Sequence, residues 1–284
     1  MAKHRMTTRR KMAIAAWRPP REGNIYGKVT VDAGRALQYL DEVRERTGEK
    51  VTVTHLVGRA LAQALAVEPT INGRIRLGRY IPHDMVSIAF LVSMPDGSDL
   101  MKARIDDVDT KTPAQIAAEL REQAERLRSG ADDDYNKSMG VVRKLPTWLL
   151  RPLLWFTGFL ASSLGINAKA LGVTAYPFGS AIVTSVGMFG LDEAFVPPTP
   201  FARVPLYVLI GAIDDRPAVV DGKVTSRPLL TVTATIDHRF IDGFQGGVLA
   251  KAFREAFEDP WSLEGGSSSD VEIEDPADRT RATA

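Results

Sequence analysis

A histidine that follows an alternating segment is the side chain best placed to do chemistry in this sequence. Residues 231–236 read TVTATI, and threonines that alternate with apolar side chains predict a strand with one polar and one apolar face. His238 comes just after this strand, and an imidazole can take up a proton near neutral pH and return it within one turnover. We therefore predict that His238 is a general base and that Asp242 supports it. The other reading is a histidine that only completes hydrogen bonds at a strand end.

The composition narrows the chemistry that the other residues can perform. The chain contains no cysteine, so disulfides, thiolate metal sites and a cysteine nucleophile are excluded, and four scattered histidines do not suggest a metal site. Lysine and arginine number 36 against 35 acidic residues, and a formal charge of +1 argues against nucleic acid as a partner. No export signal is visible, so we expect a cytoplasmic protein.

The elements that must position His238 predict an α/β chain. His55 falls near the start of one expected helix, and we expect it to be structural. Asp221 and Gly222 form a strong hairpin signal before the strand that leads to His238, and Pro95, Asp96 and Gly97 predict another turn. Strands are expected at 25–31, 74–80, 86–94, 101–108, 180–186, 206–213 and 231–236, and helices at 33–46, from 52 or 54 to 68, 112–129 and 246–257.

The domain organisation is expected to be simple. Residues 1–23 form a basic arm, residues 24–262 one domain, and residues 263–284 a polar tail that we expect to be disordered. The run WLLRPLLWFTGFLASSL at 148–164 is too short and too interrupted, by Arg151 and Pro152, to cross a bilayer. It is open to three interpretations: a buried helical hairpin, a contact between subunits, or a helix at a membrane interface.

The sequence resembles a known family of enzymes. Residues 237–243 read DHRFIDG, which is similar to the DHR-x-x-DG signature in the catalytic domain of dihydrolipoamide acyltransferases, the E2 components of 2-oxoacid dehydrogenase complexes. Residues 184–190, TSVGMFG, are similar to the family's [ST]-N-x-G-x-x-G segment, and the PTING turn at 69–73 resembles its P-x-x-N-[AG] turn. The resemblance covers about residues 9–260.

This resemblance implies a fold, an activity and roles for particular residues. The fold would be chloramphenicol-acetyltransferase-like, with a mixed central sheet flanked by helices, in a homotrimer or a higher assembly. His238 would take the proton of a thiol of coenzyme A or of a dihydrolipoyl group, the Thr184 hydroxyl of a neighbouring chain would stabilise the oxyanion, and Asp242 would hold the loop. Acyl-CoA would be a substrate, with no metal and no lipoyl group on this chain. The residues expected to contact coenzyme A are Ser87, Arg104 and Ser185.

Three departures from the family pattern leave a second function open. The sequence has no lipoyl domain, no peripheral-subunit-binding domain and no Ala/Pro-rich linker, so we expect a free-standing catalytic domain. Residues of about 132–176 form an insertion that contains the apolar run. Ala103 and Arg104, preceded by Lys102, replace the proline and valine that line the family's channel. The alternative is a non-catalytic trimeric scaffold, which could lie at a membrane surface through the insertion.

Overall fold

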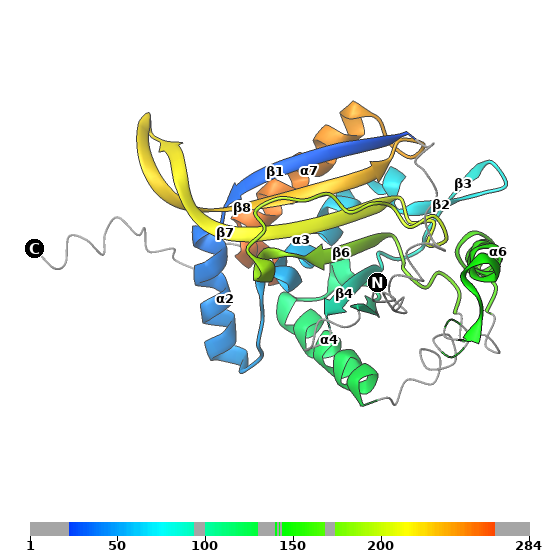
Figure 1. Cartoon of the computed structure of the whole chain (residues 1–284). Coiled ribbons are helices and arrows are strands. Elements are labelled where there is room, and N and C mark those ends of the chain that lie inside the picture. The colour runs from blue at the N-terminus through cyan, green and yellow to red at the C-terminus, as the bar shows by residue number, and fades with distance from the viewer. Residues whose placement is uncertain are drawn as a thin grey trace, which may run out of the picture.

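The computed structural model describes residues 23–93, 100–129, 140, 142, 144–167 and 174–264. The expected arm, the turn at residues 95–97 and nearly all of the expected tail lie outside these residues. The centre of the molecule is a six-stranded sheet with the strand order β1-β8-β7-β6-β4-β5 (Figure 1). Its strands are β1 (Asn24–Asp32), β4 (Ile88–Ser93), β5 (Leu100–Ile105), β6 (Ala181–Ser185), β7 (Leu206–Val220) and β8 (Lys223–Asp237).

The sheet is mixed, as predicted, and helices cover one of its faces. Strand β6 runs parallel to both β4 and β7, whereas β8 is antiparallel to β1 and β7. The apolar positions of β6, β7 and β8 pack with the helices in one large core. Figure 1 shows this helical layer behind the sheet. Its members are α2 (Gly34–Thr47), α3 (Val53–Val67), α4 (Pro113–Arg128) and α7 (Gly243–Glu258).

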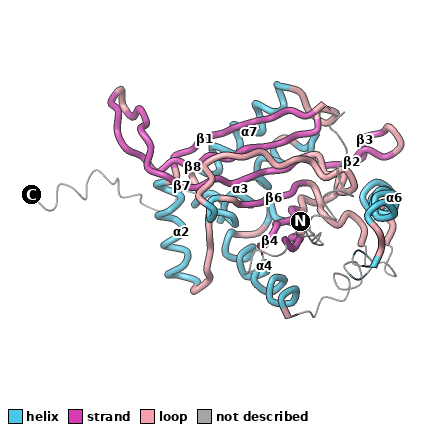
Figure 2. The backbone as a smooth tube through the Cα atoms, viewed as in Figure 1, coloured by secondary structure: helices cyan, strands magenta, loops and turns pink. Residues whose placement is uncertain are grey.

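The opposite face of the sheet is covered by the connector, residues 186–205, between β6 and β7. Figure 2 shows this segment running in front of the strands, along their length. Polar and apolar residues alternate along β8 as predicted. The polar face is nevertheless shielded from solvent, because Thr231, Thr233 and Thr235 are each 1% exposed. The Thr233 hydroxyl donates to the carbonyl oxygen of Ala194 in the connector. Thr233 therefore attaches the connector to the sheet, whereas the Thr231 hydroxyl accepts from Arg216 of β7 at 3.1 Å.

Two tight turns decide where four strands end, and these strands differ in length from the strands expected from the sequence. The expected strand at 74–80 is instead a separate hairpin of β2 (Gly73–Arg76) and β3 (Arg79–Pro82), because Leu77 and Gly78 both have positive φ. Asp221 and Gly222, with φ of 51° and 76°, make the predicted hairpin turn. Strands β7 and β8 extend to that turn, and their tip projects from the body of the molecule (Figure 1).

The ordered domain extends slightly beyond the boundary expected from the sequence. A 3₁₀ segment, η6 (Pro260–Glu264), follows α7. Leu263 is buried, and the Tyr39 hydroxyl donates to Glu264 Oε1 at 2.7 Å. Residues 263 and 264 therefore belong to the folded domain and not to the tail.

The apolar run forms α6 (Thr147–Gly158) and a π-helical turn, η3 (Phe159–Leu164). Gly158 packs so closely on the connector that a Cβ at this position would lie 2.2 Å from the Phe201 carbonyl oxygen. The prediction of a buried helical hairpin is wrong for the outward side, since Trp148, Trp155 and Phe156 are exposed. None of the helices in the described ranges combines the length and the apolar character needed to cross a membrane.

Candidate active site

The loop that carries His238 is fixed by bonds between close neighbours in the sequence. Strand β8 ends at Asp237, whose backbone N–H donates to the Pro205 carbonyl at 2.9 Å. The Asp237 carboxylate accepts from the Arg239 side chain through both oxygens, with contacts of 2.6 and 3.0 Å. The Phe240 N–H returns to the Asp237 carbonyl at 3.1 Å and closes a turn around the histidine. The sequence DHRF thus builds its own turn at the strand end.

His238 is held in the tautomer that a general base requires. Its Nδ1 lies 2.8 Å from the carbonyl oxygen of Ile241. A carbonyl can only accept, so Nδ1 must carry the proton of the neutral ring, and the lone pair lies on Nε2. The side chain is exposed within one chain. Nε2 is therefore oriented as a base at a surface that a substrate or a second chain can reach.

Asp242 supports the loop as the N-cap residue that precedes α7. Its carboxylate accepts from the Phe244 N–H at 2.8 Å, and its own N–H donates to Gln245 Oε1 at 3.0 Å. This reciprocal pair is a capping box, which satisfies backbone donors that a helix start leaves open. Helix α7 consequently begins at Gly243, three residues earlier than the apolar pattern predicts. Because Ile241 precedes this cap, the cap also fixes the carbonyl that orients His238.

Thr184 and His238 do not meet within one chain. In the sheet, Thr184 of β6 pairs with Leu209, which pairs with Thr233 of β8. His238 lies five residues beyond Thr233, about 16 Å further along the strand direction at roughly 3.3 Å per residue. One strand, β7, also separates Thr184 from β8. A hydrogen bond from Thr184 to a group bound at His238 thus requires the two residues to come from different chains.

Two of the three residues expected to contact coenzyme A share one cluster of hydrogen bonds, and the third lies apart from them. Arg104 Nε donates to Asp106 Oδ1 at 2.7 Å, and its Nη1 donates to the Ala175 carbonyl at 3.2 Å. Ser87 is buried and donates to the same Asp106 oxygen at 2.7 Å. Ser185 lies next to Thr184 on β6, so its side chain points to the opposite, helix-covered face. The structure thus brings Ser87 and Arg104 together, with Arg104 Nη2 donating to Ser87 Oγ at 3.5 Å, but not Ser185. The role of all three toward coenzyme A stays a prediction.

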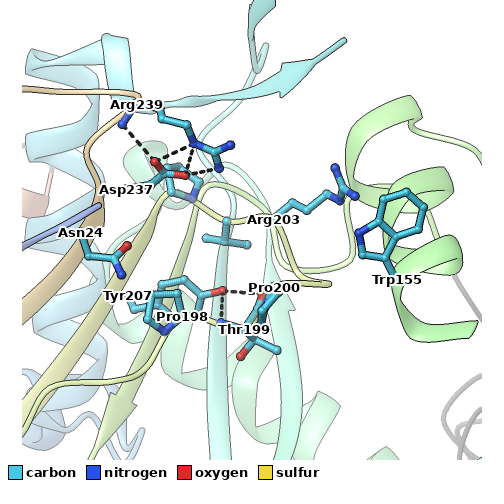
Figure 3. A pocket seen from close by; sticks show the side chains of 11 residues that line it. Asn24, Trp155, Pro198, Thr199, Pro200, Arg203, Tyr207, Asp237 and Arg239 are labelled. Carbon is cyan, nitrogen blue, oxygen red and sulfur yellow. Dashed lines mark hydrogen bonds and ion pairs between the residues drawn. The ribbon is translucent and has the colours of Figure 1, made fainter. Parts of the chain in front are cut away.

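A pocket of about 280 Å³ lies beside the His238 loop. Asp237 and Arg239 line one side of it, and Trp155 of α6 lines the other (Figure 3). His238 itself is not among the lining residues. The base thus stands next to a pocket whose opposite wall comes from the insertion. The remaining lining residues are Asn24, Pro198, Thr199, Pro200, Arg203, Val204, Pro205 and Tyr207.

Arg203 and Tyr207 give the pocket its fixed polar groups. The Arg203 guanidinium lies over the Trp155 and Phe159 rings, 5.6 and 5.2 Å from their centroids, and donates to Ser163 Oγ at 3.0 Å. The Tyr207 hydroxyl accepts from the Thr199 N–H at 3.0 Å and donates to the Thr199 carbonyl at 3.2 Å. Burial raises the pKa of Tyr207, so the phenol stays neutral. Arg203 therefore links the inserted helix to the connector at the pocket wall.

Sequence reasoning missed these pocket residues for physical reasons. Tyr207 stands in an apolar strand, and only its single hydroxyl distinguishes it from its neighbours. Arg203 is the one cation of the connector, which is a weak signal that the sequence analysis did not use. The carbonyl of Ile241 has no side-chain signature at all.

The sequence of the chain matches a known protein family. The model of the family described as 2-oxoacid dehydrogenases acyltransferase (catalytic domain) matches residues 2–136 and 167–264. The chain belongs to this family, as its motifs predicted. The match omits residues 137–166, which contain α6 and η3.

The curated relatives include acetyltransferase and succinyltransferase components of 2-oxoacid dehydrogenase complexes. The chain is 24% identical over 245 residues to the dihydrolipoyllysine-residue acetyltransferase component of the pyruvate dehydrogenase complex of Zymomonas mobilis, covering 84% of this chain and 46% of that protein. It is 25% identical over 228 residues to the dihydrolipoyllysine-residue succinyltransferase component of the 2-oxoglutarate dehydrogenase complex of Escherichia coli, covering 80% and 45%. The chain thus spans a little under half the length of these relatives.

Solved structures confirm the predicted fold class. A probable dihydrolipoamide acetyltransferase from Listeria monocytogenes aligns with a TM-score of 0.66 at 20% identity, over 96% of this chain and 99% of that one. The dihydrolipoamide acetyltransferase of Azotobacter vinelandii aligns with a TM-score of 0.64 at 21% identity, over 93% of each chain. At these identities the likeness establishes the α/β fold of the E2 catalytic domain.

Proposed function

We propose that this chain is an acyl-CoA-dependent acyltransferase that uses His238 as its base. The observation that carries the proposal is the 2.8 Å contact between His238 Nδ1 and the Ile241 carbonyl, which leaves the lone pair on Nε2. Membership of the acyltransferase catalytic-domain family supports the same chemistry. Coenzyme A and a dihydrolipoyl-type thiol are the two thiols between which the acyl group moves.

The reaction needs only proton transfer and stabilisation of negative charge. His238 Nε2 takes the proton of the attacking thiol, and the thiolate adds to the thioester carbonyl carbon. The Thr184 hydroxyl donates to the oxyanion of the tetrahedral intermediate, an interaction worth about 2.7 to 4 kcal/mol for one well-placed donor. The intermediate then releases the second thiolate, which takes the proton back from Nε2. Thiol and thioester are exchanged, so no oxidant or reductant is consumed.

The proposed site lies between two chains, and a homotrimer is the assembly that we expect. The separation of Thr184 from His238 within one chain supports a shared site. The projecting hairpin supports assembly as well, because Val219 and Val224 near its tip are 72% and 76% exposed. Apolar side chains on a projecting hairpin are the kind of surface that a neighbouring subunit covers.

The test of the proposal is acyl transfer from coenzyme A thioesters to dihydrolipoamide, followed by chromatographic separation of acyl-CoA from free coenzyme A. Acetyl-, propionyl- and longer acyl-CoA are compared for the wild type and for His238→Ala. Loss of a general base lowers the rate by about a hundredfold to ten-thousandfold. The matched control, His4→Ala, removes a histidine from the N-terminal arm and retains the rate. Equal rates for the wild type and His238→Ala would rule the proposal out.

One observation favours the second candidate, a non-catalytic scaffold. Arg104 is engaged by Asp106 and by the backbone at Ala175, although coenzyme A was expected to use it. A scaffold would assemble normally but release no coenzyme A from any thioester, with or without His238. Calorimetric titration with coenzyme A separates the two candidate functions further. An acyltransferase must bind coenzyme A, whereas a scaffold does not need to bind it.

A further inference from the structure

The outward side of α6 is an apolar surface, which we call the α6 face. It consists of Trp148, Leu149, Pro152, Trp155 and Phe156, and all five are exposed. Their spacings of three, four and seven residues place them on one side of the helix. Trp148 is 75% exposed, Trp155 56% and Phe156 54%. A contiguous surface with two tryptophans and a phenylalanine marks a binding surface more often than a scattered apolar residue does.

The domain holds this face outward. Leu150 on the inner side of α6 is fully buried with Val142, and Gly158 is pressed against Phe201. Arg203 adds a contact with the Trp155 ring and a hydrogen bond to Ser163. The helix cannot rotate to bury Trp148 and Phe156 without breaking these contacts. The exposure of the face is therefore a property of the folded chain.

The charged residues that flank the α6 face are basic from residue 135 to residue 191, after the acidic run Asp132–Asp134. Residues 135–191 contain no aspartate or glutamate, and their charged residues are Lys137, Arg143, Lys144, Arg151 and Lys169. Lys144 is exposed just before the helix, and Arg151 lies at the edge of the face. Asn24 shares the pocket with Trp155. The sequence that precedes it, residues 1–22, contains seven lysines and arginines and one glutamate.

We propose that the α6 face docks on the surface of an anionic lipid bilayer. Tryptophan is favoured at the boundary between headgroups and hydrocarbon, and flanking cations attract anionic lipids. A 12-residue helix is about 18 Å long and lies flat in such an interface. Because Trp155 also lines the pocket beside the His238 loop, docking brings a wall of that pocket to the lipid surface. The proposal concerns binding and does not depend on the proposed function.

Charge favours a lipid surface over a second copy of the chain. A two-fold contact between two α6 faces would bring two basic segments together, with no acidic residue from 135 to 191 to pair with them. Anionic headgroups supply the missing negative charge. A contact with another copy remains an outcome that the experiment below can detect.

The test is flotation of the full chain with vesicles. One half of the sample is mixed with vesicles of phosphatidylglycerol and phosphatidylcholine. The other half is mixed with vesicles of phosphatidylcholine alone. We expect the wild type to float with the anionic vesicles and to bind the neutral ones far less. Trp148→Ser/Phe156→Ser removes two of three aromatic anchors and should lower binding by about tenfold or more. Lys144→Glu should lower binding to anionic vesicles only.

Val67→Ser is the matched control, because Val67 on α3 is 53% exposed, close to the 54% of Phe156. It should bind vesicles like the wild type, and circular dichroism verifies that each variant is folded. Failure of the wild type to float with anionic vesicles overturns the proposal, and so does equal flotation of the double variant. If the double variant instead shows a smaller particle mass by light scattering while the wild type ignores vesicles, another copy covers the face and the proposal is wrong.

Discussion

His55 and His238 both lie close to the start of a helix, yet their imidazoles are held in opposite tautomers. His55 Nδ1 accepts from the Thr52 N–H at 2.9 Å, within the capping box of α3. His238 Nδ1 instead donates to the Ile241 carbonyl at 2.8 Å. The first ring uses its lone pair to complete a helix cap, whereas the second keeps its lone pair on the outward nitrogen. The bond made by one ring nitrogen thus decides whether the other can act as a base.

Burial separates the two histidines further. Burial, together with the Arg44 charge, lowers the pKa of His55 to about 4, so this ring stays neutral in the folded protein at neutral pH. His238 is exposed, and its two neighbours in the sequence, Asp237 and Arg239, line the pocket. Residue type alone therefore could not separate a structural histidine from a candidate base. The three predictions below test this contrast, from the largest expected effect to the smallest.

The largest effect is expected for the partner of His238. Thr184→Val keeps the side-chain shape and removes the hydroxyl, so the rate of acyl transfer should fall by about a hundredfold to a thousandfold. When this variant is refolded in equal amounts with His238→Ala, sites that combine an intact His238 with an intact Thr184 from another chain reappear. Random mixing predicts about one quarter of the wild-type rate, because half of the chains supply each residue.

The control for this mixing experiment is a single chain that carries both substitutions. It should remain inactive after refolding with the His238→Ala chain, because no chain in that mixture supplies an intact His238. A mixture of the two single variants that stays as inactive as each alone would show that both residues act within one chain.

The second prediction concerns His55 and pH. The folded pKa lies below the ordinary value of 6.5, so the unfolded chain binds the proton first as pH falls. The stability from neutral His55 is complete above about pH 6.5 and is lost toward pH 4, at about 1.4 kcal/mol per pH unit. His55→Gln retains an acceptor for the cap and cannot titrate. Urea unfolding from pH 8 to pH 4.5 should show equal stability at pH 8 and a smaller slope in this variant.

His83 provides the internal comparison for that measurement. Burial is the main reason that its pKa is also lowered to about 4, with Arg74 and Arg104 adding to the effect. His83 should therefore contribute to the slope that remains in His55→Gln. An unchanged slope in His55→Gln would mean that the ring is not held neutral by the fold.

The smallest effect is expected for Asp242. Asp242→Ala removes the cap of α7 and should lower the free energy of unfolding by about 1 kcal/mol. Asp242→Asn is the matched variant, because asparagine caps equally well but carries no charge. If Asp242 only holds the loop, the asparagine variant keeps both stability and turnover. Normal stability with a large loss of turnover would instead give the carboxylate a direct role in the reaction.

The sequence by itself determined the features whose bonds span only a few residues. The DHRFIDG motif indicated the family, the end of β8 and a supporting role for Asp242 in the loop, because the bonds of this loop are made by neighbours in the chain. The alternation of residues 231–236 predicted a strand, and Asp221 with Gly222 predicted the hairpin turn. These parts could be predicted because local hydrogen bonding and backbone preference fix them.

Only the tertiary structure decided which distant residues meet. The register of β6, β7 and β8 separates Thr184 from His238 within one chain. Packing of Gly158 on Phe201 turns the aromatic side of α6 outward and places Trp155 at the pocket. Arg104 was expected at a ligand, but Asp106 and a backbone carbonyl engage it. Such contacts depend on how whole elements pack, and the spacing of residues along the chain does not contain that information.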